Sequence, residues 1–270
     1  MTSVAVRTIT PIWLVAMRCV TGAALLTLWA LSRGQRFPRL TDKRWIWYAI
    51  LGLTGMVAPF YLFSRGQTVI DSGLAGITAG TMPLITIVLA HFFANERLNL
   101  QKVIGFLVGF CGLIILFLPE DFSFALIADW RSQALLLGGA VCYAVTTIIA
   151  KHAPDTPSAT GAAMMVICAA IMALIAAALS APLPSLSVKS AAMVAGLGVG
   201  STGIATILFL FVIRESGPGT IAKINYFPPV VSVTAGILLL GEDFSPKLII
   251  ALVVIVCGLL IARRKPKAVG

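Results

Sequence analysis

The sequence has little charge for its length, and acidic residues are especially few. Only 11% of the 270 residues are charged, with 10 acidic side chains against 20 basic ones, whereas 59% are hydrophobic. A soluble domain carries about a quarter charged residues, so this composition excludes a water-soluble protein. Metal ligands are scarce too, with two histidines and five cysteines that have no paired spacing. We therefore expect no metal, and we interpret the cysteines as small buried hydrophobes.

Motifs of enzymes and channels are also missing. The chain has no HExxH, no DDxxD and no nucleotide-binding glycine loop, which are patterns that position catalytic metals, diphosphates or phosphates. A channel filter such as TVGYG is absent as well. We therefore expect no enzyme, no catalytic residues and no cofactor.

What the sequence does contain is a series of long apolar stretches. A helix needs about 20 apolar residues to cross the hydrocarbon core of a bilayer. Nine stretches approach that length, at about 10–32, 44–63, 70–94, 101–118, 133–150, 160–180, 190–213, 219–240 and 246–262. The pattern predicts an all-α polytopic membrane protein with almost no chain left for a soluble domain.

The chain also repeats itself. A shift of 146 positions lays residues 73–116 over residues 219–262 without a gap. The matched residues include Gly73 with Gly219, Pro83 with Pro229, Glu96 with Glu242, and Cys-Gly-Leu at 111–113 with the same tripeptide at 257–259. A duplicated apolar chain of this kind is typical of membrane carriers with two repeats.

The repeat predicts how the chain is organised. The same shift pairs four early stretches with later ones and leaves 133–150 unpaired, because its partner would begin before Met1. We therefore expect a first repeat at 1–118 with four helices, a connecting segment at 119–132, and a second repeat at 133–270 with five helices and a basic tail. Complete copies of five spans must insert in opposite orientations, which predicts two inverted helical repeats. A misplaced start, a clipped gene or a genuine nine-helix variant would each account for the missing helix; we favour a truncated start.

The basic residues predict the orientation in the membrane. If the C-terminus is cytoplasmic, 14 basic residues fall on the inside and 6 on the outside, as the positive-inside rule requires. This distribution indicates that the basic residues interact with the lipid bilayer, and we expect no nucleic-acid partner. Trp45, Trp47 and Tyr48 directly follow the basic loop and are typical of an aromatic belt at the membrane interface.

Three segments carry a family resemblance. The pattern Pro11-x6-Arg18 opens the first complete helix, and both repeats share the spacing Pro-x12-Glu-x15-Gly within 73–116 and 220–264. Over nearly all of its length the chain resembles the EamA family of the drug/metabolite transporter superfamily. The departure is the absent first helix, which in that family helps to line the central cavity.

The resemblance implies ten helices in two inverted halves, a bacterial inner-membrane location, and export of metabolites, often amino acids, by alternating access. We accordingly expect a secondary transporter for a small-molecule substrate, acting as a monomer or homodimer. Coupling to a proton or to a counter-substrate is left open. A flippase for a lipid-linked sugar would use the same fold and is the alternative function.

Arg18 is the sharpest candidate for substrate binding, because it lies within an otherwise apolar stretch. A charge at that depth costs about 2.5–3.5 kcal/mol on insertion scales and usually faces a cavity or a partner. We interpret it as a counter-charge for a substrate carboxylate. The alternative is a side chain that snorkels outward or caps loop carbonyls.

Further candidates for substrate binding are polar or aromatic residues within the spans. Thr78 and Thr81 share a helix face, and Asn225 and Tyr226 are polar where the first copy has Ala79 and Gly80. An aromatic wall of Phe60, Tyr61, Phe63 and Tyr143 is a further hypothesis, with core packing as its alternative.

Other residues are interpreted as packing, hinge or capping residues. Gly76 and Gly80 form a GxxxG motif that permits close helix packing. Pro83 and Pro229 are expected mid-helix, where each removes a backbone bond and kinks the helix. Glu96 and Glu242 lie where one helix ends and the next begins, and we expect each to cap the helix that follows.

Overall fold

The computed structural model is helical throughout most of the residues that it describes, which are 10–70, 72–118, 130–180, 182–184, 187–227 and 246–263. Seven helices in these residues are long and apolar enough to cross a membrane, and a shorter apolar helix covers Ile249–Ala262. The predicted all-α polytopic membrane fold is therefore confirmed. Most of the expected stretch 219–240 lies outside the described residues, so the count of nine spans stays a prediction.

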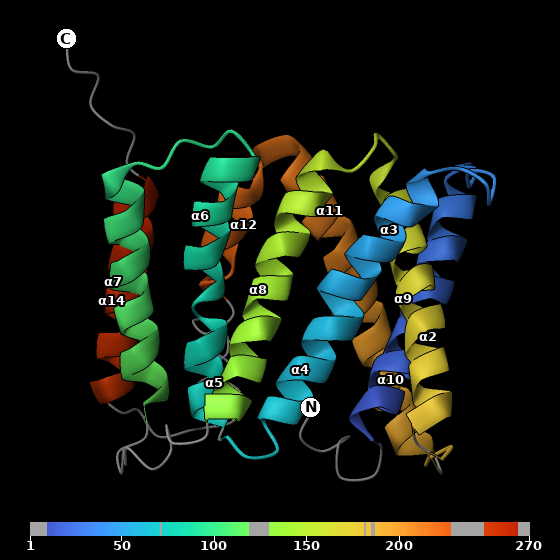
Figure 1. Cartoon of the computed structure of the whole chain (residues 1–270), viewed down its shortest axis with the longest axis horizontal. Helices are drawn as coiled ribbons and strands as arrows, with labels where there is room; N and C mark the ends of the chain where they lie inside the picture. Colours follow the sequence, from blue (N-terminus) through green and yellow to red (C-terminus); the bar gives the residue numbers. More distant parts are fainter. Residues whose placement is uncertain are drawn as a thin grey trace. The chain divides into compact units, whose positions relative to one another are not determined.

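The described helices follow one another along the chain (Figure 1). In order they are α2 (Pro11–Ser32), α3 (Arg44–Gly52), η1 (Leu53–Val57), α4 (Ala58–Gly66), α5 (Ser72–Ala79), α6 (Met82–Phe93), α7 (Leu100–Phe117), α8 (Trp130–His152), α9 (Ser158–Ser180), α10 (Val188–Leu197), η3 (Gly198–Ile204), α11 (Ala205–Ser216), α12 (Pro218–Ile224) and α14 (Pro246–Arg263). The segments η1 and η3 are π-helical.

The helices form two compact units, and each unit takes helices from both sequence repeats. The first unit comprises residues 1–64 and 149–215, and the second comprises residues 65–148 and 216–270. The compact units therefore do not coincide with the predicted repeats at 1–118 and 133–270, since each unit combines parts of both.

In the first unit, α2 packs along α9, the helix that the repeat matches to it. The hydroxyl of Thr160, in the first turn of α9, donates to Gln35, just beyond the end of α2, at 2.8 Å. The two helices therefore run in opposite directions, as equivalent helices of inverted repeats must. Many alanines of α9 are fully buried, and small residues let neighbouring helices approach closely. The buried alanines include Ala162, Ala163, Ala169, Ala173 and Ala177.

The second unit contains the matching pair, α7 and α14, which lie side by side in Figure 1. A shift of 146 carries the bounds of α7 onto those of α14. Gly105 of α7 abuts Ala262, near the end of α14, whereas Gly112 abuts Ile255. These two helices are also antiparallel, and glycine at the crossing allows their backbones to touch.

Two predicted spans contain a π-helical segment at equivalent positions. The segment η1 joins α3 to α4, and η3 joins α10 to α11; shifting Leu53–Val57 by 146 places it within η3. A π-segment widens the turn by one residue and redirects the side chains, and such segments are frequent at functional sites. Both copies keep this irregularity, so it belongs to the duplicated plan.

The predicted span 70–94 contains the apolar span Ala75–Phe93, which a turn at residues 80–81 divides into α5 and α6. α5 ends at Ala79, α6 begins at Met82, and Pro83 occupies the first turn of α6. Proline lacks an N–H and clashes with the carbonyl four residues earlier, so it fits at a helix start but not in a helix interior. Pro83 therefore lies within the span, as expected, but in the first turn of α6 and not inside a continuous helix. Pro229 lies outside the described residues.

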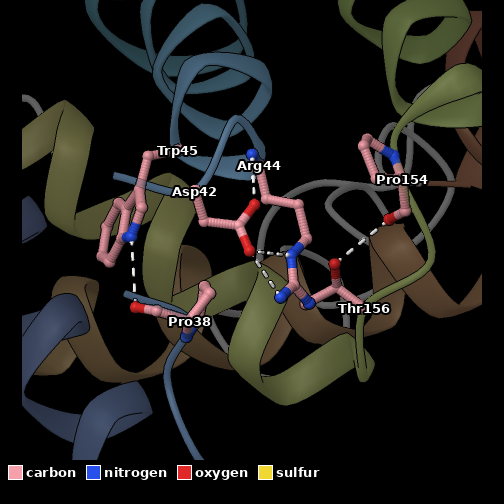
Figure 2. Close-up of polar contacts among 6 residues, drawn as sticks. All are labelled: Pro38, Asp42, Arg44, Trp45, Pro154 and Thr156. Atoms are coloured by element: carbon pink, nitrogen blue, oxygen red, sulfur yellow. Dashed lines mark hydrogen bonds and ion pairs between the residues drawn. The ribbon is translucent and has the colours of Figure 1, made fainter. Parts of the chain in front are cut away.

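One end of the first unit is fixed by two arginines. Arg44 forms an ion pair with Asp42 at 2.7 Å, and Trp45 donates its ring N–H to the Pro38 carbonyl at 3.4 Å, as Figure 2 shows. The hydrogen bond from the Arg44 side chain holds the pKa of the half-buried Asp42 carboxyl below its ordinary value.

The second arginine, Arg214, forms hydrogen bonds to the loop before α9. Its guanidinium donates to the carbonyls of Pro154 and Thr156 and, at 3.2 Å, to the Tyr48 hydroxyl. Tyr48 is fully buried against Gly161. The prediction that Tyr48 belongs to an interfacial belt is therefore wrong, because its hydroxyl is the inner anchor of this clamp.

Candidate substrate site

Arg18 lies in α2 and is buried, with 7% of its surface exposed. Its Nε donates to Thr202 Oγ1 at 2.9 Å, and its Nη2 donates to Ser201 Oγ at 3.0 Å. The guanidinium carbon lies 4.2 Å from the centre of the Phe60 ring. The side chain thus points into the first unit, and the alternative that it snorkels outward does not describe this structure.

Close approach of α2 to η3 makes this geometry possible. A Cβ on Gly22 would lie 3.0 Å from the Gly198 carbonyl oxygen, and a Cβ on Gly198 would overlap the Thr21 hydroxyl. Because both positions are glycine, the two backbones meet one turn from Arg18. The wider π-turn of η3 then presents Ser201 and Thr202, which are adjacent in sequence, to the same guanidinium.

The equivalent place in the other repeat is apolar. A shift of 146 places Met164 on Arg18, and Gly55 and Met56 on Ser201 and Thr202. Met164 is fully buried in α9, which packs against η1 as α2 packs against η3. The duplicated packing arrangement therefore works without polar groups, and the arginine with its two hydroxyls is an addition to it.

The aromatic residue that faces Arg18 is Phe60, not its neighbour Tyr61. Tyr61 lies on α4 with 51% of its surface exposed. Tyr143 is half-buried on α8 in the second unit, and its carbonyl accepts the hydroxyl of Thr147 at 2.8 Å. The ring face of Phe60 attracts a guanidinium electrostatically, by about 0.5–2 kcal/mol according to how far water is excluded.

Thr78 and Thr81 lie at the interruption between α5 and α6. The Thr81 hydroxyl donates to the Thr78 carbonyl at 2.7 Å, so it satisfies the end of α5 rather than projecting from a continuous helix. Gly76 faces the ring of Phe117, and Gly80 abuts Leu113, both on α7. The two glycines therefore let α5 pack against α7.

Asn225 and Tyr226 follow the end of α12, at the position equivalent to the α5–α6 interruption. Tyr226 is 1% exposed, and its hydroxyl donates to the Phe106 carbonyl at 2.9 Å. Its ring packs over Gly109 of α7. The side-chain nitrogen of Asn225 is buried and has no hydrogen-bond partner among the described residues. Tyr226 contacts α7 in this structure, and a role of Asn225 in substrate binding stays a prediction.

The capping role of Glu96 differs from the expected one. Asn99 caps α7 by accepting from the Gln101 N–H at 2.8 Å. Both carboxylate oxygens of Glu96 instead accept from the Gly219 N–H at the start of α12, at 3.2 Å. The expectation that Glu96 caps the helix directly after it is therefore wrong. Glu242 lies outside the described residues.

Sequence reasoning missed the hydroxyl partners of Arg18 and the clamp of Arg214. Ser201 and Thr202 lie in the run GVGSTGI, whose glycines signal close packing. The glycines do not indicate which helix packs against this run. Within the described residues, no group of three or more metal-ligating side chains is present.

Comparison with known proteins gives the family. The model of the EamA-like transporter family matches residues 1–118 and 130–264. The uncharacterised inner membrane transporter YedA of Escherichia coli K12 is 27% identical over 256 residues, which cover 91% of this chain and 79% of that protein. The aromatic amino acid exporter YddG of Ancylobacter novellus is 24% identical over 256 residues, which cover 93% and 87% of the two chains.

A solved crystal structure shows the same fold. It superimposes with a TM-score of 0.81 at 21% identity, over 94% of this chain and 89% of the other. The apolar helices, the repeat-related pairs and the family match agree with one another. This chain is a multi-pass membrane protein that belongs to the EamA-like transporter family.

Proposed function

We propose that this protein exports amino acids or closely related small metabolites across the bacterial inner membrane, and that Arg18 binds the substrate carboxylate. The observation that carries the proposal is a buried guanidinium in a membrane span, fixed by Thr202, Ser201 and the ring of Phe60. A guanidinium presents N–H donors in a planar fork that matches a carboxylate.

Preorganisation is the first argument for this role. A free arginine side chain carries about 2 kcal/mol of rotamer entropy, which binding would otherwise have to overcome. The two hydroxyls and the ring already hold Arg18 in one orientation. A carboxylate that reaches it gains charge-assisted hydrogen bonds in a site from which water is largely excluded.

The second argument is the asymmetry between the repeats. Met164, Gly55 and Met56 show that the equivalent packing is satisfied by apolar groups. Burying a charge instead costs about 2.5–3.5 kcal/mol on insertion scales. A charge retained at that cost, with hydroxyls arranged around it, is typical of a ligand site.

The relatives narrow the substrates to test first. One relative is named as an aromatic amino acid exporter, and the ring of Phe60 lies beside the arginine. We therefore place amino acids with large apolar side chains first. The remaining predicted contacts are Tyr61, Thr78, Thr81, Tyr143, Asn225 and Tyr226, with Gly76, Gly80, Pro83 and Pro229 as hinge or packing residues.

Alternating access needs elements that rearrange without losing their backbone hydrogen bonds. The π-segments η1 and η3 and the break between α5 and α6 are positions where the helical ladder is already interrupted. We propose these as the hinges, with the C-terminus in the cytoplasm and the substrate leaving toward the opposite side.

The test is transport of radiolabelled amino acids in proteoliposomes. Arg18→Met, which copies the residue of the other repeat, should fold and should reduce kcat/KM for phenylalanine by about 100-fold, the equivalent of one bidentate charged contact of roughly 3 kcal/mol. The kcat/KM of Arg18→Lys should lie between those of the wild type and Arg18→Met. Arg65→Met removes an exposed charge from α4 and serves as the matched control.

Two outcomes would count against the proposal. If Arg18→Met transports amino acids as fast as the wild type, Arg18 does not bind the substrate. Failure of the folded wild-type protein to move any amino acid would reject the substrate class and would make lipid-linked sugars the next substrates to test.

A further inference from the structure

The second unit contains a small cavity, and its lining includes no residue that is predicted to bind substrate. Its volume is about 150 Å³. Phe106 and Ala262 form part of its apolar wall, and Glu96, Lys102, Lys223 and Ser216 supply polar side chains. Substrate pockets usually measure about 300–1,000 Å³, so this cavity is too small for a whole metabolite and suits a single small charged group.

Two lysines from different helices line this cavity. Lys102 comes from the first turn of α7 and Lys223 from the last turn of α12, and both side chains are half-buried. Within the part of the chain that the structure describes, the ammonium group of neither lysine forms an ion pair or a hydrogen bond. Two half-buried cations that face one small space attract an anion.

Glu96 limits the charge of that anion. Its two oxygens are both directed at the Gly219 N–H, at 3.2 Å, so the carboxylate is bound to the α12 backbone. Two lysines and one glutamate leave the lining with one net positive charge. A singly charged group therefore balances the cavity, whereas a phosphate dianion leaves excess negative charge beside Glu96. Ser216 is a further polar residue of the lining.

We propose that this cavity binds a phosphodiester, the monoanionic group of a phospholipid headgroup, between Lys102 and Lys223. The positive-inside distribution places this end of the unit in the cytoplasmic leaflet, where basic pockets between helices bind anionic headgroups. The site is distinct from Arg18, and its function does not depend on the substrate that the protein carries.

Binding is measured on the purified full-length protein by native mass spectrometry and by thermal melting. Phosphatidylglycerol is titrated against phosphatidylcholine, and inorganic phosphate forms a separate arm. Each lysine near a membrane surface contributes about fivefold to the affinity for anionic lipid, so Lys102→Gln with Lys223→Gln should weaken phosphatidylglycerol binding about 30-fold. Lys43→Gln with Lys151→Gln removes the same charge elsewhere and should leave binding unchanged.

The outcomes separate the sources of the ligand. Saturable binding of phosphatidylglycerol that the cavity variant loses and the control variant keeps supports a lipid headgroup. Saturable binding of inorganic phosphate without binding of phosphatidylglycerol, lost in the same variant, overturns the lipid headgroup and identifies a soluble phosphate as the ligand. Equal binding of phosphatidylglycerol and phosphate by wild type, cavity variant and control overturns the proposal. Circular dichroism and size-exclusion chromatography establish that the variants are folded.

Discussion

The contact between α7 and α14 yields a sharp stability prediction, Gly258→Ala. A Cβ at this position would overlap the Gly109 N–H, and it would lie 2.6 Å from the Gly105 carbonyl oxygen and 2.7 Å from the Gly109 Cα. Optimal separations between carbon atoms are about 3.5–4.0 Å, so the helices would have to move apart by about 1 Å. Only backbone atoms surround the new methyl group, and they cannot rotate away.

The expected loss is about 3 kcal/mol, the upper end of the range for overpacked cores. At about 2–4 °C per kcal/mol for a protein of this size, the apparent Tm should fall by about 6–12 °C. Gly196→Ala is the matched control, because a Cβ there meets nothing within 4 Å on the exposed face of α10. That variant should melt at or slightly above the wild-type temperature, since alanine favours helix more than glycine.

The assay is thermal unfolding of the detergent-solubilised protein, followed by the loss of the monodisperse size-exclusion peak. Equal melting temperatures for Gly258→Ala and Gly196→Ala would refute the reasoning. Such a result would mean that α7 and α14 do not touch at these glycines. It would also refute the antiparallel packing of these two helices in the second unit.

Three further predictions follow from single contacts. Arg214→Gln should lower the unfolding free energy by about 2–3 kcal/mol, measured by the same melting assay, because two backbone carbonyls lose a charged donor. Tyr226→Phe should lower it by about 1 kcal/mol, because the buried hydrogen bond to the Phe106 carbonyl at 2.9 Å is lost. Asp42 has a lowered pKa in the folded protein, so its bond to Arg44 should persist above about pH 4 and be lost as the pH falls through that lowered pKa. Arg44→Gln should raise the Asp42 pKa, as followed by the carboxyl carbon shift in an NMR titration.

Much of the fold was predictable because duplication leaves a trace in the sequence. The offset of 146 between Gly112 and Gly258 carries the bounds of α7 onto α14. Inverted orientation follows from the odd number of spans in a complete copy. The sequence singled out Arg18, because its neighbours in the stretch are apolar, but it left open whether the side chain faces a cavity or snorkels outward.

The partners of these residues were not predictable, because they depend on which helices meet. Ser201 lies 183 positions from Arg18, and only the close approach of α2 to η3 brings them to 3.0 Å. Periodicity does not reveal the π-segments, because the stretches around them are apolar at nearly every position and a shift of one residue leaves no visible break in the pattern. The kink predicted at Pro83 is instead the start of α6. A proline marks an interruption of a helix, but the sequence does not show whether the helix bends there or starts again. Glu96 caps a helix of the other copy, which no local motif indicates.

The central claim is that the Arg18 guanidinium recognises the substrate carboxylate, and direct binding of paired ligands tests it most closely. Isothermal titration calorimetry compares phenylalanine with phenylalanine amide, which lacks only the negative charge. The wild-type protein should prefer the acid by about 100-fold, and Arg18→Met should bind both equally weakly. An unchanged preference for the acid in Arg18→Met would contradict the claim.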